Sequence, residues 1–426
     1  MQITVRGKTQ MGRKLKLVIG IAAAVGLLVL AALMLLIRFG IIDEDFLSSP
    51  SPNATPAPSD AVQTEPEHER FTISLVGDCT LAGNRFQSLC GDDMGYPFEN
   101  VREYFENDDA TIANLECNFS DALLSSGSLF HFKAPTENAD MLVSGGIDFV
   151  TTANNHIMDY GQRGLDDTLS ALDERGIAYG IDGQSVVFTT ESGLKLGIYC
   201  GYGGFMISET QIKEAIDKLK ADGAEYIICA LHWGVEGAYR PNAYQKNLAH
   251  AAIDAGADLV YGSHPHVLQP AEEYGGGLIL YSLGNFSFGG NSFPRDYDSV
   301  IVQLTLCRNA DGGVSLEACD YIPCSMSGSD ENNDFRPTPY KKGSKEFERT
   351  MSKLDGSFTG ADLEVDYSFL DPDPSPEPSK RPELPGSEEL PIPSPTPNRV
   401  PSPCRSLSIL RSRNSKTTKK RQRKFL

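Results

Sequence analysis

Short apolar runs rich in β-branched residues alternate with helical patterns from Phe71 to about Pro323, and this alternation constrains the fold most strongly. Several of the runs are continuously apolar, which is typical of strands covered on both faces. Strand–helix alternation followed by a series of strands predicts an α/β layered sandwich. The predicted strands are Phe71–Val76, Thr111–Leu115, Asp148–Ala153, Lys195–Gly201, Glu225–Leu231, Asp258–Gly262, Leu278–Ser282, Ser299–Leu306 and Val314–Ile322.

Some of the intervening helices have recognisable ends. One has leucines spaced along a single face and ends near Gly176, and a second begins at Pro241 and ends at Gly256. After Ser325 the apolar pattern weakens, and a last helix is predicted over Tyr340–Leu354.

An uncharged apolar run from Leu17 to Ile37 comes close to the ~20 residues that cross a bilayer. Basic residues precede the run and acidic residues follow it, so the positive-inside rule places the N-terminus in the cytoplasm. A cleaved signal has a shorter apolar core, and a buried core helix is the less favoured alternative. The sequence predicts a single-pass protein of the cell membrane, with a basic cytoplasmic segment over residues 1–16, a signal anchor over 17–37 and an extracellular domain.

The remaining segments differ in composition. Residues 43–70 are rich in Pro and Ser and predict a spacer, while the folded domain is expected over 71–325, or as far as 359. Residues 360–404 are rich in Pro, Ser and Glu and predict a disordered tail. The basic segment 405–426 would suit an anionic surface polymer; a plain disordered tail and a flawed gene end are the alternatives.

Charge and cysteine content narrow the function classes. The chain carries a formal net charge of −19, although both of its ends are basic, so the body between them is strongly acidic. Nucleic-acid binding needs a basic patch, so no nucleic-acid partner is expected. The number of cysteines, nine, is odd, so at least one thiol has no partner within the chain. Cys319 and Cys324 are close enough in sequence to bridge.

Polar side chains follow the predicted strands at the points where the strands end. Ligands of open α/β sheets bind outside the carboxyl ends of the strands, so we expect these side chains to lie close together. The chain has only seven His, and four of them stand in these endings. The endings are Val76-Gly77-Asp78, Asn114-Leu115-Glu116, Ala153-Asn154-Asn155-His156, Leu231-His232-Trp233-Gly234, Gly262-Ser263-His264-Pro265-His266 and Tyr281-Ser282-Leu283-Gly284-Asn285-Phe286.

The residue types in these endings indicate a divalent-metal site. Carboxylates, an amide and imidazoles together suit Mn, Zn, Fe or Co better than Ca or thiolate-bound Zn. His264 and His266 are two residues apart, so on an extended segment both rings would point the same way. Taken singly, each residue has a simpler explanation as a turn, solvated or core residue; taken in order, they predict one site. The predicted ligands are Asp78, Glu116, Asn155, His232, His264 and His266.

These ordered endings, together with Asp159-Tyr160-Gly161, resemble the signature of the CapA family. This is the bacterial poly-γ-glutamate capsule biosynthesis family, which is related to the calcineurin-like metallophosphoesterases. The resemblance covers about residues 71–325, or as far as 359. It implies a four-layer αββα sandwich with one or two ions of Mn, Zn or Fe at one edge of the paired sheets.

The resemblance also implies roles for single residues. Glu116 takes the position of the bridging carboxylate and Asn155 that of the amide ligand, while His156 takes the place of the catalytic histidine. Asp159 would orient the His156 ring. The sequence departs from the phosphoesterases at the first motif: they have Asp-x-His there, whereas Asp78 is followed by Cys and Thr, so one ion lacks a ligand.

Two functions follow from the resemblance. The first is a metal-dependent hydrolase or transferase acting on a surface polymer, such as polyglutamate or another anionic polymer, or on a phosphoester. The second is a non-catalytic polymer-binding or export component with a structural or degenerate metal site. Under both functions, the expected partners are other membrane proteins of capsule assembly. The chain has neither a Gly-x-Ser-x-Gly elbow nor a P-loop, so serine-hydrolase and ATP-driven chemistry are not expected.

Overall fold

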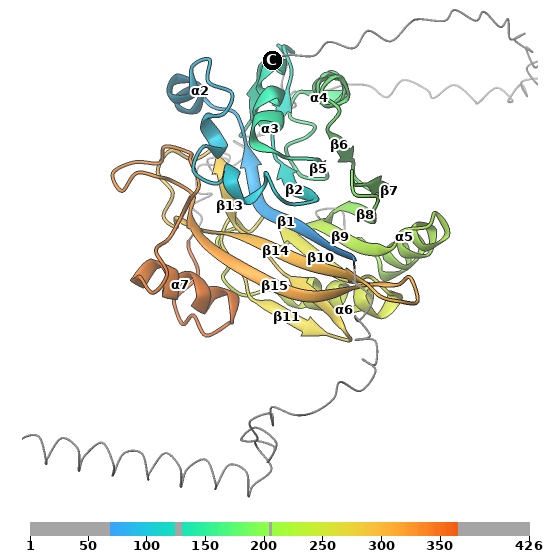
Figure 1. Ribbon diagram of the computed structural model, residues 1–426. Helices are drawn as coiled ribbons and strands as arrows, with labels where there is room; N and C mark the ends of the chain where they lie inside the picture. The colour runs from blue at the N-terminus through green and yellow to red at the C-terminus, as the bar shows by residue number, and fades with distance from the viewer. Residues whose placement is uncertain (1–68, 124–129, 204–206, 365–426) are drawn as a thin grey trace, which may run out of the picture. The chain divides into compact units, whose positions relative to one another are not determined.

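The computed structural model describes residues 69–123, 130–203 and 207–364 (Figure 1). The predicted anchor at 17–37 and both predicted tail segments, apart from residues 360–364, lie outside this part, as does the spacer up to residue 68. None of the helices in the described ranges is long and apolar enough to cross a membrane.

The first sheet is mixed and has eight strands in the order β16-β15-β14-β1-β2-β5-β6, with β13 also paired to β1. Its parallel part is β1-β2-β5-β6, and β14 and β15 add antiparallel strands on the other side of β1. The bounds are β1 Glu69–Thr80, β2 Ala110–Leu115, β5 Phe149–Thr151, β6 Ala178–Gly180, β13 Asn285–Phe288, β14 Asp298–Arg308, β15 Val314–Ser325 and β16 Thr338–Pro339.

The second sheet has six strands in the order β11-β12-β10-β9-β8-β7. Its four central strands are parallel, and an antiparallel strand closes each edge. A separate pair of two-residue strands, β3 Asn118–Phe119 and β4 Lys133–Ala134, lies outside both sheets. The bounds of the second sheet are β7 Gln184–Thr189, β8 Lys195–Tyr202, β9 Tyr226–His232, β10 Leu259–Ser263, β11 Ala271–Tyr274 and β12 Gly277–Leu280.

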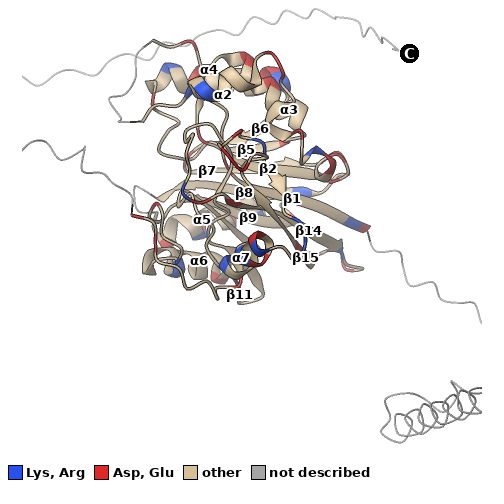
Figure 2. Ribbon diagram, turned by 90° about the vertical axis from the view of Figure 1, so that its left-hand side faces the viewer, with Lys and Arg blue, Asp and Glu red and all other residues tan. Residues whose placement is uncertain are grey.

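The two sheets pack face to face, and helices cover their outer faces (Figure 2). Apolar side chains of both sheets form the central core, including Leu75 of β1 and Ile228 of β9. Separate cores lie between the first sheet and α2, α3 and α4, and between the second sheet and α5 and α6. The helices are α2 Asn84–Cys90, α3 Asp140–Gly145, α4 Gly161–Arg175, α5 Glu209–Ala221, α6 Ala243–Ala255 and α7 Lys345–Leu354.

The α/β prediction is confirmed, and each predicted strand overlaps an observed one. The strands that were not predicted are short or lie at an edge and lack a long continuous apolar run; they are β3, β4, β6, β7, β11, β13 and β16. The predicted helix start at Pro241 is wrong by two residues. The Asn242 side chain caps α6 by accepting a hydrogen bond from Gln245 N at 2.9 Å, so the helix begins at Ala243.

One prediction near the C-terminal side of the domain needs correction, and one disulfide that the cysteine spacing would allow is not formed. The last helix begins at Lys345 rather than at the predicted Tyr340, because Gly343 has a φ of 77° that a helix cannot include. Cys319 and Cys324 are free thiols. They lie an odd number of residues apart on β15, so their side chains point to opposite faces of the sheet.

Candidate metal centre

The carboxyl ends of the parallel strands bring the predicted residues to one edge of the paired sheets. In the first sheet, Asp78 of β1 pairs with Asn114 of β2, and Glu116 follows directly after β2. In the second sheet, His232 ends β9 and pairs with Ser263, which ends β10. The two sheets therefore face each other across this edge with a carboxylate pair on one side and histidines on the other.

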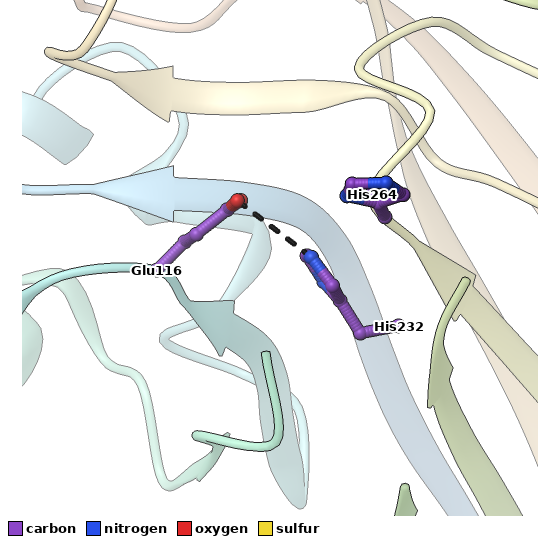
Figure 3. A group of neighbouring side chains, drawn as sticks. All are labelled: Glu116, His232 and His264. Carbon is purple, nitrogen blue, oxygen red and sulfur yellow. Dashed lines mark ion pairs between the residues drawn. The ribbon is translucent and has the colours of Figure 1, made fainter. Parts of the chain in front are cut away.

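Glu116 and His232 form the inner part of the cluster with His264 (Figure 3). His232 Nε2 lies 3.7 Å from Glu116 Oε1 and 2.8 Å from Asn155 Oδ1. Ligand atoms of Glu116, His232 and His264 all lie within 4.8 Å of one another. Donors that share one ion at about 2.0–2.2 Å are separated by at most about 4.4 Å, so this group needs only small movements to hold an ion.

A second group joins the same carboxylate to the other side of the cluster. His266 Nε2 lies 3.8 Å from Glu116 Oε1, and His266 Nδ1 lies 3.2 Å from Asp78 Oδ2. Glu116 thus belongs to both groups. One buried carboxylate is therefore shared by two groups of side chains that could each hold an ion.

The environment of the Glu116 carboxylate is the feature that best fits a bound cation. The residue is fully buried, and among the described residues neither of its carboxylate oxygens has a hydrogen-bond partner. His264 Nδ1 is likewise buried without a partner. Buried polar atoms are nearly always satisfied, and an unsatisfied carboxylate is costly. A divalent ion would satisfy these atoms together.

The electrostatics of the cluster agree with this interpretation. Burial raises the pKa of Glu116 well above its ordinary value, and the charge of Asp78 adds to the rise. Burial and the neighbouring histidines lower the pKa of His232 well below its ordinary range and that of His264 to about 4. Both rings are therefore neutral at pH 7, the form that binds metals.

His266 behaves differently because two carboxylates face it. Burial lowers its pKa, but Glu116 and Asp78 outweigh burial and raise the pKa to about 10. A proton on this ring and a divalent ion beside it neutralise the same negative charge, so they compete. Asn285 Oδ1 lies 2.9 Å from His266 Nδ1 and fixes the ring orientation.

The structure also brings His156 and Asp159 together, as predicted. His156 Nδ1 lies 2.9 Å from Asp159 Oδ2, which also accepts a hydrogen bond from Phe132 N at 3.0 Å. His156 Nε2 lies 3.9 Å from Glu116 Oε1, so the ring borders the cluster without bonding to it. The aromatic ring of Phe132 packs against the His156 ring with centroids 4.5 Å apart.

The expectation of an extended backbone at the histidine pair is wrong. His264 and His266 have φ values of 95° and 56°, in the left-handed region that side chains rarely adopt. His264 N donates to Asp78 Oδ2 at 3.2 Å, and Asn285 Nδ2 donates to His266 O at 3.3 Å. Tertiary hydrogen bonds of this kind hold the strained conformation, as is common at functional sites.

Several supporting residues escaped the sequence-based prediction. Ser263 Oγ lies 2.9 Å from His232 Nδ1, and Asn114 Nδ2 donates to Asp78 Oδ1 at 2.9 Å. With Asn285, both stand inside the motifs that resemble the CapA family, and that position was their only signal in the sequence. Glu236 lies in a loop after β9 and carried no signal of its own, yet it belongs to the cluster with His264 and His266.

A family profile described as "Bacterial capsule synthesis protein PGA_cap" matches residues 72–184 and 187–290. The chain belongs to this family. The match spans every predicted ligand of the cluster, and the resemblance noted from the motifs is confirmed. Members of the PGA_cap family are therefore the proper comparison for this chain.

Two relatives cover most of the folded domain. The chain is 30% identical over 322 residues to the "PGA biosynthesis protein CapA" of Bacillus subtilis (strain 168), covering 70% of this chain and 83% of that protein. It is 29% identical over 290 residues to the "Capsule biosynthesis protein CapA" of Bacillus anthracis, and this match covers 61% of this chain and 68% of that protein. Among solved structures, a hypothetical protein from Thermus thermophilus aligns with a TM-score of 0.38 at 16% identity, covering 59% of this chain and 98% of that chain.

Proposed function

We propose that this PGA_cap protein is a membrane-anchored, extracellular metalloprotein that acts on a surface polymer such as poly-γ-glutamate. The observation that carries the proposal is the buried, unpartnered carboxylate of Glu116, which faces three histidines. The names of the two CapA relatives supply the polymer and the capsule context. The apolar run at 17–37 supports the anchor, and other capsule-assembly proteins of the membrane are the expected partners.

The preferred activity is metal-dependent hydrolysis of the polymer or of a phosphoester. A bound divalent ion would supply positive charge for the substrate's oxygen and a water whose pKa falls toward ~7. The hydrogen bond between His156 Nδ1 and Asp159 leaves His156 Nε2 directed at the cluster. From there His156 would pass a proton to the leaving group, and Asp159 would hold the ring in that orientation.

The acidic body of the chain makes a cation at the site necessary for an anionic substrate. A net charge of −19 repels polyglutamate, and the repulsion falls only where positive charge is concentrated. His232 and His264 are neutral at pH 7 and do not provide this charge, and the positive charge of protonated His266 is already offset by Glu116 and Asp78. A metal ion between Glu116 and the histidines would provide it.

The second candidate function is a non-catalytic polymer-binding or assembly component. The departure at the first motif favours it, because Cys79 stands next to Asp78 and the usual histidine two residues after the Asp is replaced by Thr80. Burial raises the pKa of Cys79 to about 12, so its thiol stays protonated and is a poor ligand. Under this alternative the ion would fix the shape of the site and bind polymer carboxylates without turnover.

The two candidates are separated by turnover measured on the full-length chain in detergent. The protein loaded with Mn²⁺ or Zn²⁺ is tested on a phosphoester and on a γ-glutamyl polymer, with the His264→Ala/His266→Ala variant as the metal-binding control. Metal-dependent turnover that the variant lacks supports the hydrolase. Polymer binding without turnover supports the assembly component, and normal metal content in the variant would contradict both.

A further inference from the structure

Three overlapping groups of metal-binding side chains make up the cluster, and the third is the most open. Asp78, Glu116 and His232 in the first two groups are buried, whereas Glu236, His264 and His266 of the third are all half-buried. The ligand atoms of the third group lie within 4.8 Å of one another. Glu236 therefore belongs to the part of the cluster that solvent reaches.

The backbone around Glu236 is fixed against the histidine loop. Gly237 N donates to Pro265 O at 2.8 Å, which joins the loop after β9 directly to the segment between the two histidines. Gly237 has a φ of 75°, and a Cβ there would lie 2.6 Å from Leu363 O, so only glycine fits. From the other side, Leu363 N donates to Gly237 O at 2.9 Å.

The carboxylate of Glu236 has no cation of the protein to pair with. Within the described part of the chain, no Lys or Arg forms a salt bridge with it, although many other acidic residues have such partners. Its neighbours in the group are the two histidines, and one of them, His264, has a buried Nδ1 without a hydrogen-bond partner among the described residues. A carboxylate held half-buried against an unsatisfied imidazole is an arrangement that an ion would complete.

We propose that Glu236 is a direct ligand of the divalent ion held by His264 and His266, and that it makes up for the donor missing from the first motif. This inference rests on the metal site of the proposed function. It also specifies the ion: with Asp78 and Glu116, Glu236 gives the cluster three carboxylates. An oxygen-rich set of this kind favours Mn²⁺ or Fe²⁺ over Zn²⁺ among ions of similar availability.

The test is Mn²⁺ binding by equilibrium dialysis of the full-length chain, with bound Mn²⁺ also followed by its electron paramagnetic resonance. Two variants are compared with wild type: Glu236→Ala, and Glu236→Gln, which keeps the shape and removes the charge. Glu273→Ala is the matched control, because it removes an equal charge from an exposed residue of β11 at the opposite end of the strands. Thermal unfolding in EDTA checks that all variants fold.

Both Glu236 variants should weaken Mn²⁺ binding at least about 10-fold or bind one ion fewer per chain, and their Mn²⁺ spectrum should change. The Glu273 variant should bind as wild type does. Unchanged affinity, ion count and spectrum in the Glu236 variants would overturn the inference while leaving the metal site intact. Absence of Mn²⁺ and Zn²⁺ binding in wild type would overturn the metal site itself, and the role of Glu236 with it.

Discussion

The buried carboxylate of Glu116 lowers the stability of the fold in the absence of an ion and is suited to bind one. Its carboxylate is buried among Asp78, His232 and His266 without a hydrogen bond, and burial holds its pKa well above the ordinary value. In the absence of an ion, such a group destabilises the fold by the cost of its desolvation. Strained and unsatisfied groups of this kind are tolerated where function needs them.

The variant Glu116→Gln tests directly whether this carboxylate destabilises the ion-free protein. In EDTA its free energy of unfolding should be about 1–3 kcal/mol higher than that of wild type, because a buried neutral amide costs less than a buried carboxylate, by more than the lost attraction to protonated His266. With Mn²⁺ present the order should reverse, since the variant loses the carboxylate shared by both groups of ligands. Denaturant titrations with and without Mn²⁺ measure both differences, and a variant that is less stable in EDTA would show that Glu116 is satisfied within the protein.

His156 is expected to move a proton rather than to bind the ion. If it moves a proton, His156→Ala should lower kcat by about 10²–10⁴-fold, since a positioned acid or base contributes that much. Metal content should stay as in wild type, because His156 Nε2 borders the cluster at 3.9 Å without belonging to a ligand group. Steady-state kinetics with parallel metal analysis decides; an equal loss of metal and activity would make His156 a ligand instead.

At the scale of the elements, the sequence predicted what the strands themselves determine. Asp78 and Glu116 stand at strand ends of the first sheet and His232 at a strand end of the second, so strand pairing within each sheet and packing of the two sheets bring them together. The left-handed backbone of His264 and the loop position of Glu236 depend on contacts with other loops, which local pattern does not encode. Edge strands such as β7 were missed for a related reason, because a short, half-buried edge strand has no long continuous apolar run.

Helix α7 offers a test of how the end of the domain is attached. It is tied to β14 through Asp298, whose carboxylate accepts hydrogen bonds from Arg349 Nε at 2.7 Å and Lys353 Nζ at 2.7 Å. Burial raises the pKa of Asp298, but the two cations outweigh burial and lower it below the ordinary value. A carboxyl with a lowered folded-state pKa stabilises the protein above its unfolded pKa of about 3.9 and loses this effect as the pH falls below it.

Replacing Asp298 by Asn should therefore cost about 1–3 kcal/mol at pH 7, because Lys353 loses one of its two carboxylate partners and keeps Asp296 at 2.6 Å. The variant should also lose part of the fall in stability that wild type shows below about pH 4. Urea titrations at pH 7 and at pH 3–4 provide the measurement. Equal losses at both pH values would mean that the carboxylate charge plays no part in holding α7.

At the scale of the whole molecule, the proposal joins an acidic extracellular domain to a membrane anchor. The family membership and the two CapA relatives concern the folded domain, and the anchor rests on the uncharged run at 17–37 with basic residues before it. Removal of residues 1–42 should shift the protein from the membrane fraction to the soluble fraction without changing its Mn²⁺ affinity. Continued membrane association of the truncated chain would show that another segment provides the attachment.

The central claim is that Glu116 and the histidines around it hold a divalent ion. The most direct measurement is anomalous X-ray diffraction at the manganese edge from crystals of the domain grown with Mn²⁺. The account predicts a strong peak about 2.0–2.3 Å from a Glu116 carboxylate oxygen, on the side that faces His232, His264 and His266. A map without a peak at Glu116, at a Mn²⁺ concentration that saturates the protein in solution, would contradict it.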